Sequence, residues 1–144
     1  MKKIPYIDNF DEWKNDFSFS IPIKIRFSET DMFGHVNNVS PFIYFEEGRI
    51  AYLQSMGLFN MEDASEGMPI VADLQCDYLK QMYFGDQLTL YVKTASVGNT
   101  SLDIHYMIKD EKDEVSVTGR GRMVYINPAS GKPIALPQIL KEKL

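Results

Sequence analysis

Cysteine is almost absent from this chain, because Cys76 is the single copy among 144 residues. One cysteine cannot form an internal disulfide, so we expect a structural thiol in a reducing compartment. Long apolar runs are absent as well, and acidic residues follow Lys2 and Lys3 where a signal peptide would have an apolar run. We therefore expect a cytoplasmic protein that neither spans a membrane nor is anchored to one.

Basic residues and histidine are also scarce. The 15 Lys and Arg are outnumbered by 20 Asp and Glu, and the formal net charge of −5 argues against nucleic acid as a partner. A metal site would need more ligands than Asp31 and His35 provide, and the only other histidine, His105, falls on the outward face of a distant strand. We expect no metal and no cofactor.

Five segments alternate apolar and polar residues with the period of a half-buried strand. They are residues 21–28, 69–79, 88–92, 102–108 and 114–126. The apolar face of the first segment comprises Ile21, Ile23, Ile25 and Phe27. The turn-forming runs GNTS (98–101) and DEKDE (110–114) are suited to join neighbouring strands as hairpins.

One long helix is predicted between the first and second of these strands. Residues 40–57 carry Pro41, which suits a first helical turn, and end at Gly57, which suits a helix stop. One helix and several antiparallel strands indicate an α+β fold, with a sheet of about five strands wrapped around the central helix. Gly119 and Gly121 share the apolar face of the last strand, which favours close approach of the helix there.

The chain has the length of one typical domain. We assign residues 1–144 to a single domain, with 1–20 as an N-terminal extension and 128–144 as a C-terminal tail packed on the domain or on a partner. The predicted helix is apolar nearly all round, so one sheet does not supply enough surface to bury it. We therefore expect at least a homodimer, or a tetramer built of such dimers.

Glu46 and Arg49 interrupt the apolar stripe that Phe42, Phe45 and Leu53 form on this helix. The spacing of three residues favours an ion pair that neutralises itself at the edge of the core. A catalytic Glu46 is the alternative, because a carboxylate within an apolar stripe can also serve chemistry.

The loop TDMFGHVNN (30–38) lies directly before the helix and is rich in Asp, Asn and Gly. Such residues favour solvated turns, because their side chains bond nearby backbone amides. The loop also leads into a helix N-terminus, where unpaired amides and the helix dipole favour developing negative charge. Water attack on a thioester or ester needs a carboxylate and oxyanion donors, so a catalytic loop containing Asp31 is the competing interpretation.

A family resemblance rests on this loop and the helix after it. RFSETDMFGHVNNVSPFIYFEEGRIAYL (26–53), followed by four strands, resembles the hotdog-fold acyl-CoA thioesterases of the 4-hydroxybenzoyl-CoA thioesterase type. The resemblance implies hydrolysis of a CoA thioester to an acid and CoA. It implies Asp31 as the catalytic carboxylate, acting as base or nucleophile, and the Asn38 amide as the group that polarises the carbonyl. His35 and Asn37 would orient the loop and assist water.

The resemblance also implies further substrate contacts in a cleft formed by two chains. Phe33, Asn37 and Glu46 are candidates near the loop and helix. Some members of the family hold a CoA phosphate with basic residues before the Ser of a hairpin, where this chain has Gly98, Asn99 and Thr100 before Ser101. Ser101 is a further candidate for substrate binding. Asn99 or Arg120 of one subunit would then serve Asp31 of the other. Arg120 and Arg122 are substitutes for the missing cations, or ordinary charges on a strand face.

Two alternatives to a thioesterase remain open from the residues alone. The first is a non-catalytic hotdog module that binds acyl-CoA, and the second is a hydratase acting on enoyl-CoA. Acyl-CoA is favoured over acyl carrier protein as the partner, because the acidic surface of that protein would meet an acidic enzyme.

Overall fold

A five-stranded antiparallel sheet with the strand order β1-β3-β4-β5-β2 forms the centre of the molecule. The computed structural model describes residues 2–57 and 67–144. The strands are β1 (Phe19–Ile23), β2 (Met68–Tyr78), β3 (Leu88–Val97), β4 (Ser101–Lys109) and β5 (Val115–Ile126). The helices are α1 (Phe10–Asn15), the short 3₁₀ helix η1 (Phe27–Glu29), α2 (Ser40–Ser55) and α3 (Gln138–Lys143). None of the helices described is long and apolar enough to cross a membrane.

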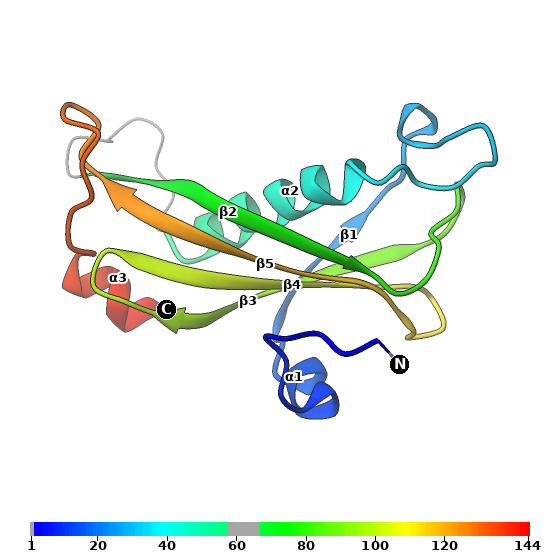
Figure 1. Cartoon of the computed structure of the whole chain (residues 1–144), viewed down its shortest axis with the longest axis horizontal. Coiled ribbons are helices and arrows are strands. Elements are labelled where there is room, and N and C mark those ends of the chain that lie inside the picture. Colours follow the sequence, from blue (N-terminus) through cyan, green and yellow to red (C-terminus); the bar gives the residue numbers. More distant parts are fainter. Residues whose placement is uncertain (1, 58–66) are drawn as a thin grey trace.

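Helix α2 is the predicted central helix, and it lies along one face of the sheet (Figure 1). Pro41 stands in its first turn, and Gly57 follows its end with φ +71°, a conformation that favours glycine. A Cβ on Gly48 would lie 2.3 Å from the side chain of Leu90, and a Cβ on Gly119 would lie 2.4 Å from that of Phe45. The helix and sheet therefore approach more closely than larger residues would allow, which confirms the prediction for Gly119.

Gly121 has a different role from the predicted one. Its missing side chain leaves room for Leu74 of the neighbouring strand β2, whose side chain would lie 2.6 Å from a Cβ there. Phe45 and Tyr106 stack at 4.5 Å at the centre of the core between α2 and the sheet. The same core cluster includes Leu53, in the last turn of α2, and Leu136.

The first strand was placed wrongly by its alternation. β1 ends at Ile23, and Phe27 lies in the 3₁₀ helix with 77% of its surface exposed. The physical reason is local hydrogen bonding around Glu29. Its side chain accepts a bond from the Arg26 amide at 2.7 Å, and its own amide donates to the Arg26 carbonyl at 2.9 Å. These bonds turn the chain and end the extended segment.

The predicted ion pair within α2 does not form. Glu46 is exposed and makes no ion pair with Arg49 in the described structure. Arg49 is buried, as its place in the apolar stripe requires, and donates to the Tyr106 hydroxyl at 3.3 Å. The spacing therefore identified the buried arginine but assigned it the wrong partner.

The N-terminal segment with α1 packs on part of the opposite face of the sheet (Figure 1). Ile4, Ile7 and Trp13 form a second apolar cluster with Met107 of β4. The Trp13 indole Nε1 donates to Nδ1 of His105 at 2.9 Å, and burial lowers the pKa of His105 to about 4. The second histidine is thus a neutral hydrogen-bond acceptor beneath α1.

Candidate active site

The loop before α2 is closed by its own backbone. Asp31 and His35 are joined by a bond from the Asp31 amide to the His35 carbonyl at 2.8 Å, and Gly34 takes φ +79° in the turn between them. The loop is also fixed to the chain after β2, because Val36 donates to the Met82 carbonyl at 2.7 Å. A second bond, from the Phe84 amide to the Gly34 carbonyl at 3.0 Å, completes this attachment. The position of Asp31 is therefore set by main-chain hydrogen bonds.

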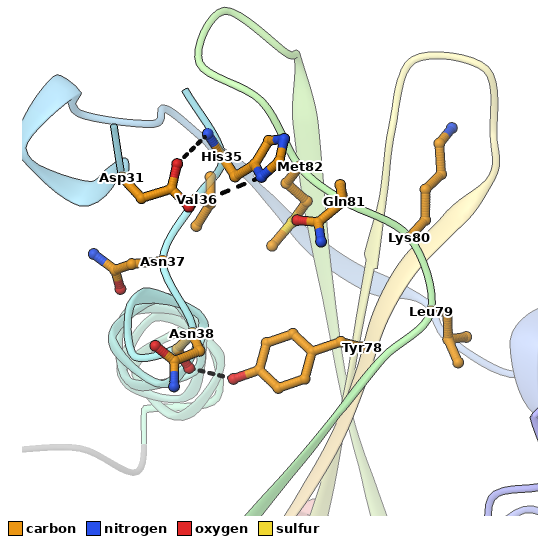
Figure 2. Close-up of a pocket in the computed structure, with 10 residues that line it drawn as sticks. All are labelled: Asp31, His35, Val36, Asn37, Asn38, Tyr78, Leu79, Lys80, Gln81 and Met82. Atoms are coloured by element: carbon orange, nitrogen blue, oxygen red, sulfur yellow. Dashed lines mark hydrogen bonds and ion pairs between the residues drawn. The ribbon is translucent and has the colours of Figure 1, made fainter. Parts of the chain in front are cut away.

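The two oxygens of the Asp31 carboxylate have different surroundings (Figure 2). Oδ1 accepts hydrogen bonds from the amides of Phe33 at 2.9 Å and His35 at 3.0 Å, which hold the side chain in the turn. Oδ2 lies 3.8 Å from Nδ1 of His35 and accepts no hydrogen bond from the described residues. The side chain is 42% exposed, so Oδ2 is open to a substrate or water.

Asn37 caps the first turn of α2. Its Oδ1 accepts from the Val39 amide at 3.0 Å, the Ser40 amide at 2.9 Å and the Ser40 hydroxyl at 3.0 Å. Pro41 has no amide hydrogen. The amide of Asn38 is left without a hydrogen-bond acceptor among residues 2–57 and 67–144. Within the described ranges, the Asn38 amide is therefore the one free donor at the N-terminus of the long helix, where the dipole favours negative charge.

The chain after β2 provides the opposite wall of a cleft with a volume of about 500 Å³. The lining residues are Asp31, His35, Val36, Asn37, Asn38, Tyr78, Leu79, Lys80, Gln81 and Met82. The Tyr78 hydroxyl donates to the Asn38 carbonyl, and burial raises the pKa of Tyr78 to about 12. The ammonium of Lys80 points away from Asp31 to the carboxylates of Asp110 and Glu114, which raise its pKa.

Sequence reasoning missed the whole segment 78–82. The alternation of residues 69–79 marks Tyr78 only as an apolar residue near the end of a strand. Its contact with Asn38 joins residues that are 40 positions apart in the sequence. No local pattern signals that contact, because it depends on where the end of β2 meets the start of α2.

The other residues predicted to bind substrate do not line this cleft. Phe33 is 71% exposed beside it, with its ring 6.2 Å from that of His35. Glu46 lies on α2, and Asn99 and Ser101 lie at the β3–β4 hairpin. Arg120 binds two carboxylates on the outer sheet face, Asp103 at 2.8 Å and Asp73 at 3.1 Å. Within one chain, Glu46, Asn99, Ser101 and Arg120 do not line the cleft that contains Asp31. The contribution of Asn99 or Arg120 from a partner subunit stays a prediction.

The cleft combines one accessible carboxylate oxygen with one free backbone donor. A carboxylate can activate water or attack a carbonyl carbon, and a fixed amide at a helix N-terminus can stabilise the oxyanion that develops. Among the residues that the structure describes, no three His, Cys, Asp or Glu side chains are grouped so that they could hold a metal ion. The chemistry that this arrangement supports is hydrolysis of a carbonyl compound.

Comparison with known proteins gives a consistent result. A family model described as the thioesterase-like superfamily matches residues 25–144. The uncharacterized protein YsmA of Bacillus subtilis (strain 168) is 46% identical over 145 residues, which cover 100% of this chain and 97% of that protein. The crystal structure of a thioesterase from Thermus thermophilus, complexed with coenzyme A and Zn, is 30% identical with a TM-score of 0.77, covering 88% of this chain and 97% of that one. The structure of a predicted thioesterase from Bacillus stearothermophilus is 31% identical with a TM-score of 0.78, covering 88% and 92%.

Proposed function

Because this chain belongs to the thioesterase-like superfamily and is a thioesterase with the hotdog fold, we propose that it hydrolyses acyl-CoA thioesters at the cleft beside Asp31. The thioesterase from Thermus thermophilus, 30% identical to this chain, was solved with coenzyme A bound, which supports CoA as the thiol of the substrate. The products are a free carboxylic acid and CoA.

The observation that carries this proposal is the free Asn38 amide in the same cleft as Asp31 Oδ2. The thioester carbonyl oxygen accepts a hydrogen bond from this amide, and the helix dipole adds to the stabilisation as negative charge develops. The carbonyl carbon becomes more electrophilic as a result.

Asp31 supplies the second half of the reaction. Either its Oδ2 removes a proton from a water molecule that attacks the carbonyl carbon, or it attacks the carbon itself and forms an anhydride that water hydrolyses. In both routes the C–S bond breaks, the sulfur leaves as CoA thiolate and takes up a proton, and one oxygen of water ends in the acid.

His35 is proposed to orient this carboxylate. Its backbone amide binds Oδ1 at 3.0 Å and its ring lies 3.8 Å from Oδ2. The ring packs edge-on against Tyr83 at 4.8 Å, which limits its rotation. This arrangement gives His35 a supporting role beside Asp31.

Replacing Asp31 tests the proposal directly. In Asp31→Asn the amide oxygen can still accept from Phe33 and His35, so the loop should keep its shape. Loss of the base or nucleophile should lower kcat by about 10²- to 10⁴-fold while leaving acyl-CoA affinity nearly unchanged. Thiol release should be measured over a panel of CoA thioesters that differ in chain length and aromaticity, with an enoyl-CoA included.

The matched control is Asp11→Asn, which changes the same functional group in the first turn of α1. This variant should hydrolyse thioesters at the parent rate. An Asp31→Asn enzyme as fast as the parent would show that Asp31 is only a turn residue. If the parent bound acyl-CoA in calorimetry without releasing thiol from any thioester, the chain would be a binding module instead.

A further inference from the structure

The peptide unit that carries the free Asn38 amide lies between two peptide units that are each held by hydrogen bonds. On one side, the Asn37 amide donates to the Glu29 carbonyl at 2.8 Å. On the other side, the unit joining Asn38 to Val39 is held at both ends. Its carbonyl accepts from the Tyr78 hydroxyl, and its amide donates to Asn37 Oδ1 at 3.0 Å. Rotation of the intervening peptide is therefore restricted from both directions.

We propose that Tyr78 is a positioning residue for catalysis, which aims the Asn38 amide at the thioester carbonyl through its hydrogen bond to the Asn38 carbonyl. This inference rests on the proposed function, because it assigns Tyr78 a part in the same oxyanion site. A donor aligned before the substrate binds needs no reorganisation during the reaction, and that property gives such donors most of their effect.

The setting of Tyr78 suits this role. Tyr78 is the last residue of β2, so the sheet fixes its backbone while its ring reaches across the cleft to the start of α2 (Figure 2). Its raised pKa keeps the hydroxyl protonated, and therefore able to donate, at every pH at which an acyl-CoA assay is run. No other side chain among the described residues bonds the Asn38 carbonyl.

Tyr78 also offers a way to examine a donor that substitution cannot remove, because the Asn38 amide belongs to the main chain. Tyr78→Phe keeps the ring that lines the cleft and removes the hydroxyl, which bonds the Asn38 carbonyl and also interacts with the Cys76 thiol. We expect kcat to fall by about tenfold to a hundredfold, less than the loss seen when an oxyanion donor is deleted outright. KM and the Kd of a non-hydrolysable thioether analogue of acyl-CoA should stay within about twofold of the parent values.

Two further variants make the result decisive. Tyr78→Ala also removes the ring, so it should raise KM in addition to lowering kcat. Tyr91→Phe removes a hydroxyl from the outer sheet face, away from the cleft, and should behave as the parent. Melting midpoints of all variants show whether the fold is retained, and a half-exposed Tyr78 makes the Phe variant a mild change for stability.

The outcomes separate this inference from the proposed function. If Asp31→Asn is inactive while Tyr78→Phe keeps the parent kcat, the positioning role is wrong and the thioesterase site stands. If Tyr78→Phe raises KM at unchanged kcat, the hydroxyl contacts the substrate in its ground state, which also overturns the inference. If Asp31→Asn itself keeps full activity, the error lies in the proposed site.

Discussion

A single side-chain oxygen at the start of α2 decides which amides remain available to a ligand. Asn37 Oδ1 binds the donors of Val39 and Ser40, which would otherwise be unpaired in the first helical turn. The Asn38 amide is left free of any acceptor in the part of the chain that the structure describes. Asn37 therefore stabilises the start of α2 and leaves free the amide that we propose as the donor to the substrate.

Removing this cap should affect stability and activity together. Asn37→Ala frees the bonded donors and should lower the free energy of unfolding by about 1 kcal/mol, the usual cost of losing an N-terminal cap. It should also lower kcat, because the peptide units around Asn38 lose one of their fixed contacts. Urea denaturation and thiol release measure the two effects.

Asn37→Asp supplies the control for this variant, because its carboxylate oxygen can accept the same bonds. It should restore most of the stability and of kcat. Activity equal to that of the parent in Asn37→Ala would contradict a role for the cap in catalysis.

The local sequence was sufficient to predict that the Asp31 carboxylate and the helix start lie close together, but not which residues face them across the cleft. Asp31 and Asn38 are seven residues apart on a loop whose composition marks a turn before a helix. Tyr78 reaches Asn38 only because the sheet brings the end of β2 to that point. Local spacing can also predict a contact that does not form. The spacing of Glu46 and Arg49 on the helix permits an ion pair, but Arg49 donates to the Tyr106 hydroxyl instead.

At the scale of elements, the alternation of apolar and polar residues predicted the strands of the sheet but misplaced the bounds of edge strand β1. The long strands β2 to β5 contain enough residues for the period to be clear, whereas β1 has five. The six-residue helix α1 is too short to show a helical period, although Asn9 caps it through its side chain. Its packing on the sheet depends on contacts with β4 that no local pattern reveals.

The contact between α1 and β4 should make stability depend on pH. The pKa of His105 is about 4 in the folded protein, below the ordinary value of 6.5, so the unfolded chain binds a proton at a higher pH than the folded one. The stability linked to this group is therefore fully present above about pH 6.5 and is lost as the pH falls toward 4. The loss should amount to about 3 kcal/mol at most.

His105→Gln tests this dependence, because glutamine can accept the Trp13 hydrogen bond without titrating. Denaturant midpoints of parent and variant should be compared between pH 7 and pH 4. The parent should lose more stability than the variant over this interval. Equal slopes would show that His105 does not govern the attachment of α1.

At the scale of the whole molecule, the two edges of the sheet differ. Edge strand β1 is short and carries Pro22, which limits pairing with another chain. Edge strand β2 spans 11 residues and exposes Met68, Ile70 and Val71. Arg49 is buried as well, and its hydrogen-bond partner is the neutral Tyr106 hydroxyl. No carboxylate of the described residues forms an ion pair with Arg49. These features favour burial of this side of the molecule against a second copy.

We predict that the protein is a homodimer or a tetramer of such dimers. Light scattering at micromolar concentration should return two or four times the single-chain mass of 16.6 kDa. Pairing of β2 edges would remove an exposed strand edge and the apolar side chains beside it. A monomeric mass with full thioesterase activity would contradict both the dimer and a site shared between subunits.

The loop that carries Asp31 is attached to residues 82–84 through main-chain hydrogen bonds. Carbonyls and amides of residues 34, 36, 82 and 84 hold the loop, so its shape depends little on the side chains at 36, 82 and 84. Position 34 favours glycine, because its φ is +79°. The exposed side chains of Met32, Phe33 and Phe84 lie on the loop and on the segment that holds it, and none of these side chains bonds to Asp31. We therefore expect substitutions at these positions to change which acyl groups are accepted while the proposed hydrolytic chemistry is preserved, so that substrate preference would be separable from turnover.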